Sequence, residues 1–370
     1  MKILYVTTIG STMDFFKSFI NQLIDEGHTV DNATNDTERK VPDLYYELGC
    51  KVYRIDCSRS PFKTGNIRAI KQLKKLCEEN KYDIVHCHTP IAAMCTRLAC
   101  RGVRKKGTKV IYTAHGFHFY KGAPLKNWLI YYPVEKFCSH FTDVLITINN
   151  EDYELASKKM KAKKVVYVPG VGIDLEKFSK CTVDINEKRK ELGIPKNAFI
   201  LLSVGELNHN KNHEAVIKAI KNKDVYYLIA GKGGLQEYLQ NEIDDCGLNG
   251  RVKLLGFRTD IKELLSVADV FVFPSFREGL SVSLMESMSN GKPCIVSKIR
   301  GNVDLIDEGK GGFLCSPGDS AAFAQAIEKL AADENLRNRM GEYNKQRIKE
   351  FDLAVVNEMM KNIYQSVLKD

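Results

Sequence analysis

The stretch PSFREGLSVSLMESMSNGKP, residues 274–293, decides the fold of this 370-residue chain. It follows the apolar run Val270–Phe273 and precedes a second one, Cys294–Ser297. Ser281 is a suitable N-cap for a helix over 281–289, and Asn290-Gly291 is a stop signal. A strand, a loop, a helix and a further strand in this order predict a parallel sheet flanked by helices.

Two glutamates flank the start of this helix, Glu278 before it and Glu286 inside it. The unpaired N–H groups of a helix N-terminus favour anions, so the segment predicts a phosphate cradle with a carboxylate on either side. Because a carboxylate does not bind phosphate, sugar hydroxyls are the expected partners of both glutamates. A capped surface helix with two solvated glutamates is the alternative.

Apolar strands alternate with amphipathic helices along the whole chain, in two series. The first series predicts strands at 2–7, from 27 onward, and at 51–55, 84–87, 109–113, 144–148 and 165–168; the second predicts them at 199–204, 225–230, 252–255, 270–273, 294–297 and 313–315. We predict an α/β protein of two Rossmann-like domains, 1–170 and 171–350, facing each other across a cleft. Residues 174–197 predict a polar linker, and apolar residues at helical spacing predict a closing helix over 351–370.

Several classes of protein are disfavoured by the sequence. No apolar run reaches membrane-spanning length, and Met1-Lys2 leads into a strand rather than a signal peptide. The eleven cysteines include no C-x-x-C pair, so we expect reduced thiols in a cytoplasmic protein. The first strand is not followed by G-x-G-x-x-G, which disfavours a nicotinamide enzyme.

The positive charge is concentrated in the first half. Residues 1–170 hold 27 Lys and Arg against 17 Asp and Glu, a net +10, whereas residues 171–370 hold 28 against 29, a net −1. No Asp or Glu lies between Asp83 and Glu135, and this span contains the basic residues Arg97, Arg101, Arg104, Lys105, Lys106, Lys109, Lys121 and Lys126. A solvated basic face is one interpretation; we favour an anionic partner.

Aromatic residues interleave with lysines after residue 116. They are Phe117, Phe119, Tyr120, Trp128, Tyr131 and Tyr132, next to Lys121 and Lys126. The pattern is typical of a protein that lies on an anionic membrane surface, and no recognised nucleic-acid module is present. Core aromatics in an ordinary helix are equally compatible with it.

Four histidines follow two predicted strands as H-x-H and H-x-x-H: His86, His88, His115 and His118. Imidazole is a common zinc ligand, but no Asp or Glu lies near these pairs in the sequence to complete a second shell. The second half also lacks a D-x-D motif in a strand-end loop. We therefore expect no metal and no cofactor.

Three segments together resemble retaining glycosyltransferases of family 4, which have the GT-B fold: residues 274–293, Ser203–His213, and Thr113-Ala114-His115-Gly116. The resemblance covers nearly the whole chain. It implies transfer from a UDP-sugar to a polyprenyl-diphosphate-linked saccharide in capsule or exopolysaccharide synthesis, at the inner face of the plasma membrane. It also implies that the first domain binds the acceptor, that the second binds the nucleotide sugar, and that the closing helix packs on the first.

The resemblance implies catalytic roles for His115, Lys211 and Glu278. Lys211 is expected to hold the donor diphosphate, Glu278 the transferred sugar and Glu286 the ribose. Glu206 stands where the family has arginine, and we expect it to hold Lys211 or a sugar hydroxyl. The donor-binding set is Gly205, Glu206, Lys211, Gly256, Phe257, Arg258, Glu278, Gly279, Leu280, Ser281, Ser283 and Glu286; the acceptor-side set is Gly10, Ser11, His88, His118 and Lys121.

Two other functions fit the same scaffold. One is a nucleotide-sugar epimerase or hydrolase, which needs no acceptor. The other is a nucleotide-binding module without catalytic activity.

Overall fold

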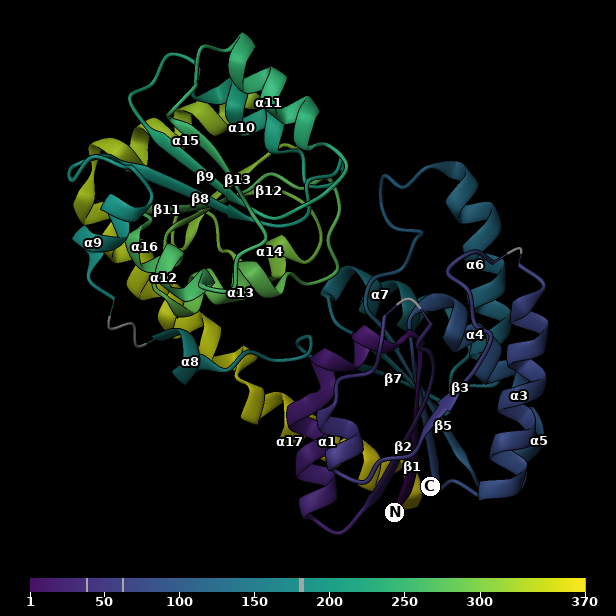
Figure 1. Ribbon diagram of the computed structural model, residues 1–370. Helices are drawn as coiled ribbons and strands as arrows, with labels where there is room; N and C mark the ends of the chain where they lie inside the picture. The colour runs from purple at the N-terminus through teal and green to yellow at the C-terminus, as the bar shows by residue number, and fades with distance from the viewer. Residues whose placement is uncertain (38, 62, 180–182, 370) are drawn as a thin grey trace. The chain divides into compact units, whose positions relative to one another are not determined.

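The computed structural model describes residues 1–37, 39–61, 63–179 and 183–369, which form two compact units (Figure 1). The first unit comprises Met1–Gly172 and Leu353–Asp370, and the second comprises Ile173–Asp352. The predicted borders at 170 and 351 each lie within two residues of these. In each unit helices cover both faces of one parallel sheet, as predicted.

Within the described residues, the sheet of the first unit has seven strands in the order β3-β2-β1-β4-β5-β6-β7. The strands are β1 (Lys2–Ile9), β2 (Thr29–Asn35), β3 (Val52–Arg54), β4 (Ile84–His88), β5 (Lys109–Ala114), β6 (Val144–Thr147) and β7 (Lys164–Tyr167). Residues 3–8 of β1 are all buried, because helices cover both faces of a parallel sheet. The order reverses between β1 and β4, which is the topological switch point of this sheet.

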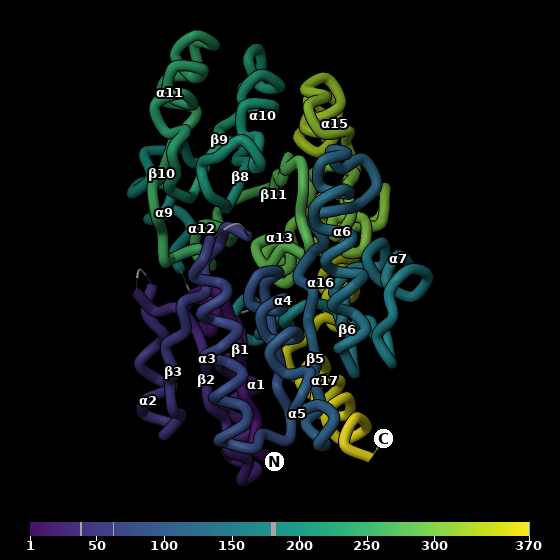
Figure 2. The backbone as a smooth tube through the Cα atoms, turned by 90° about the vertical axis from the view of Figure 1, so that its right-hand side faces the viewer, coloured from purple at the N-terminus to yellow at the C-terminus, as the bar shows by residue number. Residues whose placement is uncertain are grey.

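Two layers of helices enclose this sheet (Figures 1 and 2). One face packs against η1 (Gly10–Phe16), α1 (Lys17–Asp25) and α17 (Leu353–Lys369). The other packs against α3 (Gly65–Asn80), α4 (Pro90–Ala99), α6 (Leu125–Ser139) and α7 (Asn150–Lys159). The short helices α2 (Leu44–Glu47) and α5 (Arg101–Arg104) complete the unit.

The predicted closing helix is α17, and it packs on the first unit, where the resemblance places it. Val356, Met360, Ile363 and Val367 are buried there, whereas Val355 is exposed. The Tyr364 hydroxyl joins Nδ1 of His86 (2.7 Å) and the hydroxyl of Tyr5 (2.9 Å), so the helix is also held by a buried polar network. Residue 370, the predicted end of this helix, lies outside the described residues.

Within the described residues, the second unit has a six-stranded sheet in the order β10-β9-β8-β11-β12-β13. Its strands are β8 (Ile200–Val204), β9 (Tyr226–Ala230), β10 (Val252–Gly256), β11 (Val270–Phe273), β12 (Cys294–Ser297) and β13 (Gly312–Cys315). One face packs against α8 (Leu175–Ser179), α9 (Ile185–Glu191), α12 (Ile261–Val267), α13 (Val282–Ser289) and η2 (Ile348–Phe351); the other packs against α10 (His213–Ala219), α11 (Gln236–Asp245), α15 (Ser320–Ala332) and α16 (Glu334–Arg347). The short helix α14 (Asn302–Leu305) follows β12. Here the switch point lies between β8 and β11.

The prediction of an irregular linker over 174–197 is wrong for the part that the structure describes. Helices α8 and α9 lie there, and Asp184 caps α9 by accepting hydrogen bonds from the N–H groups of Asn186 and Glu187. Phe178, Leu192 and Ile194 are buried in the core of the second unit. These few apolar residues are enough to dock short helices, although most of the segment is polar. Residues 180–182 lie outside the described residues.

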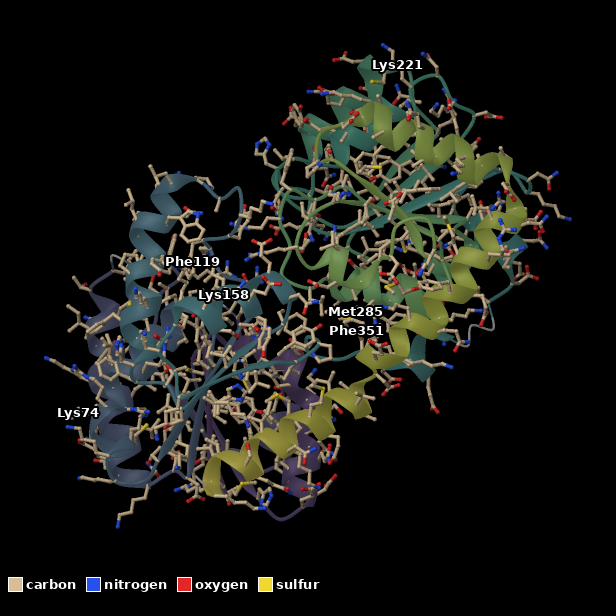
Figure 3. The ribbon with its side chains drawn as sticks, turned by 180° about the vertical axis from the view of Figure 1, so that it is seen from behind. Lys74, Phe119, Lys158, Lys221, Met285 and Phe351 are labelled. Atoms are coloured by element: carbon tan, nitrogen blue, oxygen red, sulfur yellow. The ribbon has the colours of Figure 1, made fainter. Side chains whose placement is uncertain are left out.

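The aromatic segment after residue 116 belongs to the core rather than to a membrane face. Phe117 and Phe119 are buried and stack with ring centroids 4.8 Å apart. Trp128 and Tyr132 are partly buried against the same cluster. Figure 3 shows Phe119 within the first unit, whereas Lys74 lies at its outer edge. The core interpretation of these aromatics is therefore correct.

Two arginines of the carboxylate-free span are not part of a basic surface. Arg97 is buried and pairs with Glu135 (2.8 Å), and Arg104 forms two hydrogen bonds to Asp143 (2.9 and 3.0 Å). Both carboxylates lie beyond the segment in sequence and come close only through packing. The basic surface is therefore smaller than the sequence predicts.

Two observations on the described residues bear on the predicted location. Among residues 1–37, 39–61, 63–179 and 183–369, no helix has the length and apolar character needed to cross a membrane. The described cysteines are free, and most of them are buried. Cys181 lies outside the described residues.

Candidate active site

The switch point of the second unit brings together two predicted site segments. The loop after β8 carries Lys211, and the loop after β11 carries Glu278. Nζ of Lys211 lies 2.8 Å from Oε1 of Glu278, and the two side chains are 18% and 14% exposed. The lysine also lies over the ring of Phe273, 4.5 Å from its centroid. Ligands bind at such points in open α/β sheets, so this ion pair marks a candidate site.

Hydrogen bonds between the two loops fix the position of this pair. Nδ2 of Asn210 donates to the carbonyl of Arg277 (2.9 Å), and the N–H of Phe276 donates to the carbonyl of Asn210 (2.8 Å). Nδ2 of Asn212 donates to the carbonyl of Pro274 (3.1 Å). The asparagines on either side of Lys211 therefore hold its loop against the one that carries Glu278.

Glycine at 205 leaves room for the lysine. A Cβ at this position would lie 3.1 Å from Cε of Lys211 and 3.2 Å from its Cδ. Larger side chains there would have to displace Lys211. Gly205 therefore serves the site by admitting the lysine side chain.

Helix α13 begins and ends where the sequence predicts. The hydroxyl of Ser281 accepts a hydrogen bond from the N–H of Leu284 (3.4 Å), and the helix ends at Asn290 before Gly291, whose φ is +73°. Its N-terminus follows directly on the Glu278–Leu280 loop. The partial positive charge of that end is available to an anion held beside Lys211.

Glu286 lies half-buried on α13. No hydrogen bond or ion pair to its carboxylate forms among the residues that the structure describes. Burial raises its pKa to about 7, against a smaller opposing effect of Lys177 on α8. A half-buried carboxylate without a partner costs folding free energy, which is typical of groups kept for a ligand.

Two residues that support the site were not predicted. Nε of Arg300 donates to the carbonyl of Glu278 (3.2 Å). Gly301 has φ +78°, and a Cβ there would lie 2.2 Å from the carbonyl oxygen of Gly279. The sequence carried a signal for them, since Gly301 closely follows β12, whose carboxyl end neighbours that of β11.

Glu206 does not hold Lys211, contrary to one of the two roles expected of it. Its side chain is exposed and accepts a hydrogen bond from Nδ2 of Asn208 (3.0 Å). Lys211 pairs with Glu278 instead, because the loop after β11 packs directly on the loop after β8 that carries Lys211. The role of Glu206 toward a sugar hydroxyl stays a prediction.

The predicted segment Gly256–Arg258 lies at the end of β10, with β9 between it and β8. Gly256 has φ +69° and accepts a hydrogen bond from the N–H of Gly231 (2.8 Å), while Phe257 is 70% exposed. The Arg258 guanidinium pairs with Asp260 and with Glu191 (3.0 Å). These ion pairs tie α9 to α12, so the charge of Arg258 serves the fold, and the loop offers its backbone and an exposed aromatic ring.

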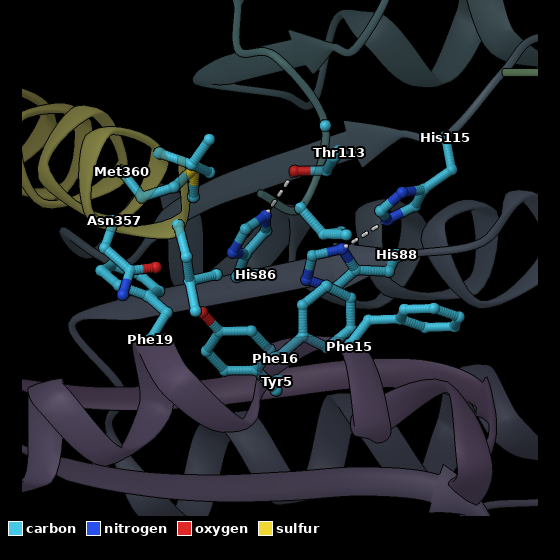
Figure 4. Close-up of a pocket in the computed structure, with 14 residues that line it drawn as sticks. Tyr5, Phe15, Phe16, Phe19, His86, His88, Thr113, His115, Asn357 and Met360 are labelled. Carbon is cyan, nitrogen blue, oxygen red and sulfur yellow. Dashed lines mark hydrogen bonds between the residues drawn. The ribbon is translucent and has the colours of Figure 1, made fainter. Parts of the chain in front are cut away.

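In the first unit, three of the four histidines line one small cavity of about 40 Å³ (Figure 4). Nδ1 of His88 lies 3.1 Å from Nε2 of His115, and Nε2 of His86 lies 2.8 Å from the hydroxyl of Thr113. Burial lowers the pKa of His86 to about 3 and of His115 to about 4, and it lowers the pKa of His88 well below its usual range. The described residues contain no group of three His, Cys, Asp or Glu side chains arranged to hold a metal.

A larger cavity, of about 290 Å³, lies at the switch point of the first sheet. It lies at the ends of β1 and β4, and its polar lining includes Thr8, Thr12, Arg59 and Thr89. His118 and Tyr131 also line it, with ring centroids 4.6 Å apart. Hydroxyls, a cation and aromatic rings suit a phosphorylated saccharide.

The other predicted acceptor-side residues are not gathered at this cavity. His88 is buried, and so is Gly10, where the backbone of residues 39–41 fills the space of a side chain. An acceptor contact therefore does not fit either residue. Ser11 lies in η1. Lys121 lies on an exposed turn, and its backbone N–H donates to the Glu151 carboxylate (2.7 Å).

Comparisons with known proteins decide the family. Residues 184–347 match the family model "Glycosyl transferases group 1", and residues 2–149 match "Glycosyl transferase 4-like". EpsD of Bacillus subtilis (strain 168), a protein named as a glycosyltransferase, is 41% identical over 85% of this chain and 85% of its own. The chain belongs to the group 1, 4-like glycosyltransferases. The resemblance to family 4 is thereby confirmed.

Further matches to this glycosyltransferase are a relative whose name gives a lipid-linked saccharide as its substrate, and two solved structures. A UDP-Gal:alpha-D-GlcNAc-diphosphoundecaprenol alpha-1,3-galactosyltransferase of Escherichia coli is 34% identical, over 82% of each chain. The crystal structure of Anabaena HepE in complex with UDP matches with a TM-score of 0.82 and 22% identity, over 99% of this chain and 100% of that one. WaaG, a glycosyltransferase of lipopolysaccharide biosynthesis, matches with a TM-score of 0.75 and 16% identity, over 98% and 99%. The predicted GT-B fold is confirmed.

Proposed function

We propose that this glycosyltransferase moves a sugar from a UDP-sugar, with retention of configuration, to a hydroxyl of a polyprenyl-diphosphate-linked saccharide during capsule or exopolysaccharide synthesis. The observation that carries the proposal is the Lys211–Glu278 pair beside the N-terminus of α13, with the unpartnered Glu286 further along that helix. Retention rests on the family 4 resemblance. The UDP-sugar and the lipid-linked acceptor are supported by the named relatives.

Each charged group then has a role in the transfer. Nζ of Lys211 and the N–H groups of α13 receive the negative charge that develops on the diphosphate as its bond to the anomeric carbon breaks. Glu278 orients the transferred sugar, and Glu286 accepts hydrogen bonds from the ribose hydroxyls. His115 is the residue of the first unit that we assign to the transferred sugar. Transfer in this scheme needs neither metal nor cofactor.

The acceptor is assigned to the first unit. The cavity at its switch point offers Arg59 to a phosphate and hydroxyls to a saccharide, and the ring of Tyr131 can pack on a sugar. This assignment keeps His118 on the acceptor side.

The experiment that tests the function compares turnover with and without acceptor. The full chain is incubated with several UDP-sugars and an undecaprenyl-diphosphate-linked monosaccharide, and UDP release and lipid mass are followed. We expect UDP release that needs the acceptor, a lipid heavier by one sugar, and an anomeric configuration equal to that of the donor. Turnover without acceptor would indicate the epimerase or hydrolase, and no turnover would indicate a binding module.

Nucleotide-sugar affinity should rise with pH through about 7 if Glu286 holds the ribose. Hydroxyl groups donate better to a carboxylate than to a neutral acid, and Glu286 loses its proton near that pH. The Glu286→Gln variant should bind with a nearly constant affinity, weaker than wild type at high pH by roughly 1–3 kcal/mol. Titration calorimetry with a UDP-sugar from about pH 5 to about pH 9 checks this, because its diphosphate does not titrate near neutrality. A wild-type profile that the variant reproduces would contradict the role.

Peripheral membrane binding is proposed for an exposed face of α6 rather than for the predicted aromatics. Its apolar side chains Leu125, Leu129, Ile130, Val134 and Phe137 are exposed, and the exposed Lys126 and Lys136 lie on the same helix. Apolar and cationic side chains on one helix fit an anionic lipid surface. Arg101, at the start of α5, adds a further exposed cation.

Leu129→Glu should weaken binding to anionic vesicles by roughly tenfold, because the leucine loses its burial among lipid and a like charge is added. Ile67→Glu on α3, which also replaces an exposed apolar side chain, is the matched control and should bind as wild type. Co-sedimentation with phosphatidylglycerol and with phosphatidylcholine vesicles at rising salt measures both. An equal loss of vesicle binding in the two variants, or vesicle binding that does not change with salt concentration, would refute the assignment to α6.

A further inference from the structure

The buried histidine cluster of the first unit contains one polar atom that the proposed function does not explain. Nε2 of His88 is buried and finds no hydrogen-bond partner among the residues that the structure describes, although the other ring nitrogen of His88 contacts His115. His88 is the last residue of β4, two positions after His86, and both residues are buried. The arrangement of protons in this cluster can be worked out from these contacts.

Only one proton arrangement avoids a buried N–H without an acceptor. Burial keeps both rings uncharged at neutral pH, so in the 3.1 Å contact one nitrogen donates and the other accepts. If Nδ1 of His88 accepted, the proton of His88 would sit on the enclosed Nε2 and donate to nothing. Orphaned buried N–H groups are rare, and leaving a donor unsatisfied is costly. His88 therefore carries its proton on Nδ1 and donates to Nε2 of His115.

Packing holds the His88 ring in the orientation that this hydrogen bond to His115 requires. It stacks with Tyr5 at a centroid distance of 5.5 Å and packs against Phe16 at 4.2 Å. His86, at 4.1 Å, is itself fixed by Tyr364 and Thr113. Figure 4 shows these rings around the His88–His115 contact. Residues from β1, η1, β4, β5 and α17 therefore combine to orient one imidazole.

We propose that His88 is a positioning residue: it fixes His115 as a neutral imidazole with its proton on Nδ1, the nitrogen that His115 offers to the substrate. Since Nε2 of His115 is occupied and the described part of the chain supplies no acceptor for its Nδ1–H, this Nδ1–H can only donate a hydrogen bond to a ligand. Its target is an oxygen that accepts, such as a hydroxyl of the transferred sugar, and His115 does not act as a base. The role of this hydrogen bond in turnover rests on the proposed function, whereas the tautomer itself does not.

The wild-type protein alone tests the tautomer. Two-bond ¹H–¹⁵N correlations of full-length, ¹⁵N-histidine-labelled protein distinguish the two neutral forms, and the loss of one signal set in His115→Gln assigns His115. We expect the proton of His115 on Nδ1 without any substrate. A proton on Nε2 of His115, or a charged ring at neutral pH, would overturn the proposal whether or not the protein proves to be a glycosyltransferase.

Variants then separate positioning from packing. His88→Leu should mix the tautomers of His115 and lower kcat/KM for the nucleotide sugar about tenfold, while KM for the acceptor stays unchanged. His88→Asn, whose amide nitrogen can lie where Nδ1 lay, should restore most of the loss. Phe16→Leu loosens the same ring without removing the hydrogen bond and should keep the Nδ1–H form. A loss in Phe16→Leu equal to that in His88→Leu, or a His88→Leu variant with unchanged tautomer and rate, would overturn the proposal.

Discussion

Replacing Lys211 with alanine is expected to lower kcat by on the order of a hundredfold or more, the effect seen when a charge-stabilising donor is removed from an active site. The substitution removes the cation that we assign to the leaving diphosphate. It also exposes Glu278, which then faces that diphosphate without its partner 2.8 Å away. Both changes raise the energy of the transition state. Steady-state rates at saturating donor and acceptor measure the effect.

A second variant separates the lost cation from the exposed carboxylate. In Lys211→Ala/Glu278→Gln the unpaired Glu278 carboxylate no longer faces the phosphates, so nucleotide affinity should recover in part while kcat stays low. Lys218→Ala on α10, which breaks a surface pair with Glu242, is the control and should leave kcat unchanged. Near-normal turnover of Lys211→Ala would contradict the assignment.

The same account predicts that turnover continues in EDTA. Lys211 and the N-terminus of α13 stand where a divalent ion would otherwise stabilise the leaving group. Activity that EDTA abolishes and that magnesium or manganese restores would show that fixed protein donors are not sufficient.

Breaking the Arg97–Glu135 pair should destabilise the first unit by about 3–5 kcal/mol. Arg97 is 1% exposed, donates to Glu135 (2.8 Å) and to the carbonyl of Ala93 (3.0 Å), and lies over the ring of Tyr112. Arg97→Met would leave the Glu135 carboxylate buried without a cation. Urea unfolding followed by tryptophan fluorescence measures the loss, because the single tryptophan, Trp128, lies in α6 of this unit.

Removing both charges should be far less harmful than removing one. The free energy of unfolding of Arg97→Met/Glu135→Leu should lie within about 1 kcal/mol of the wild-type value or exceed it, since apolar side chains of similar size replace a desolvated pair. Lys158→Met, which breaks an exposed pair with Glu154, should change stability by less than about 0.5 kcal/mol. A double variant as unstable as Arg97→Met would mean that the arginine acts through packing rather than charge.

The sequence alone determined the strands of both sheets and much of the candidate site, but not helices α8 and α9. Strands such as β11 and β12 followed from apolar runs, and α13 from its cap at Ser281 and its stop at Asn290-Gly291, because these signals act between residues close in the chain. Glu278 was predicted from its place before the N-terminus of a helix, and Lys211 from the resemblance to family 4.

Only the tertiary structure decided which of these residues meet. Lys211 pairs with Glu278, 67 positions away, rather than with Glu206, and Arg97 of α4 pairs with Glu135 of α6 in the same layer of helices. The aromatics after residue 116 face the core, and the contact between His88 and His115 depends on β4 pairing with β5. Strand order and helix packing determine which residues become neighbours. Partners that are far apart in the sequence leave no local sequence signal, so they could not be predicted from the sequence alone.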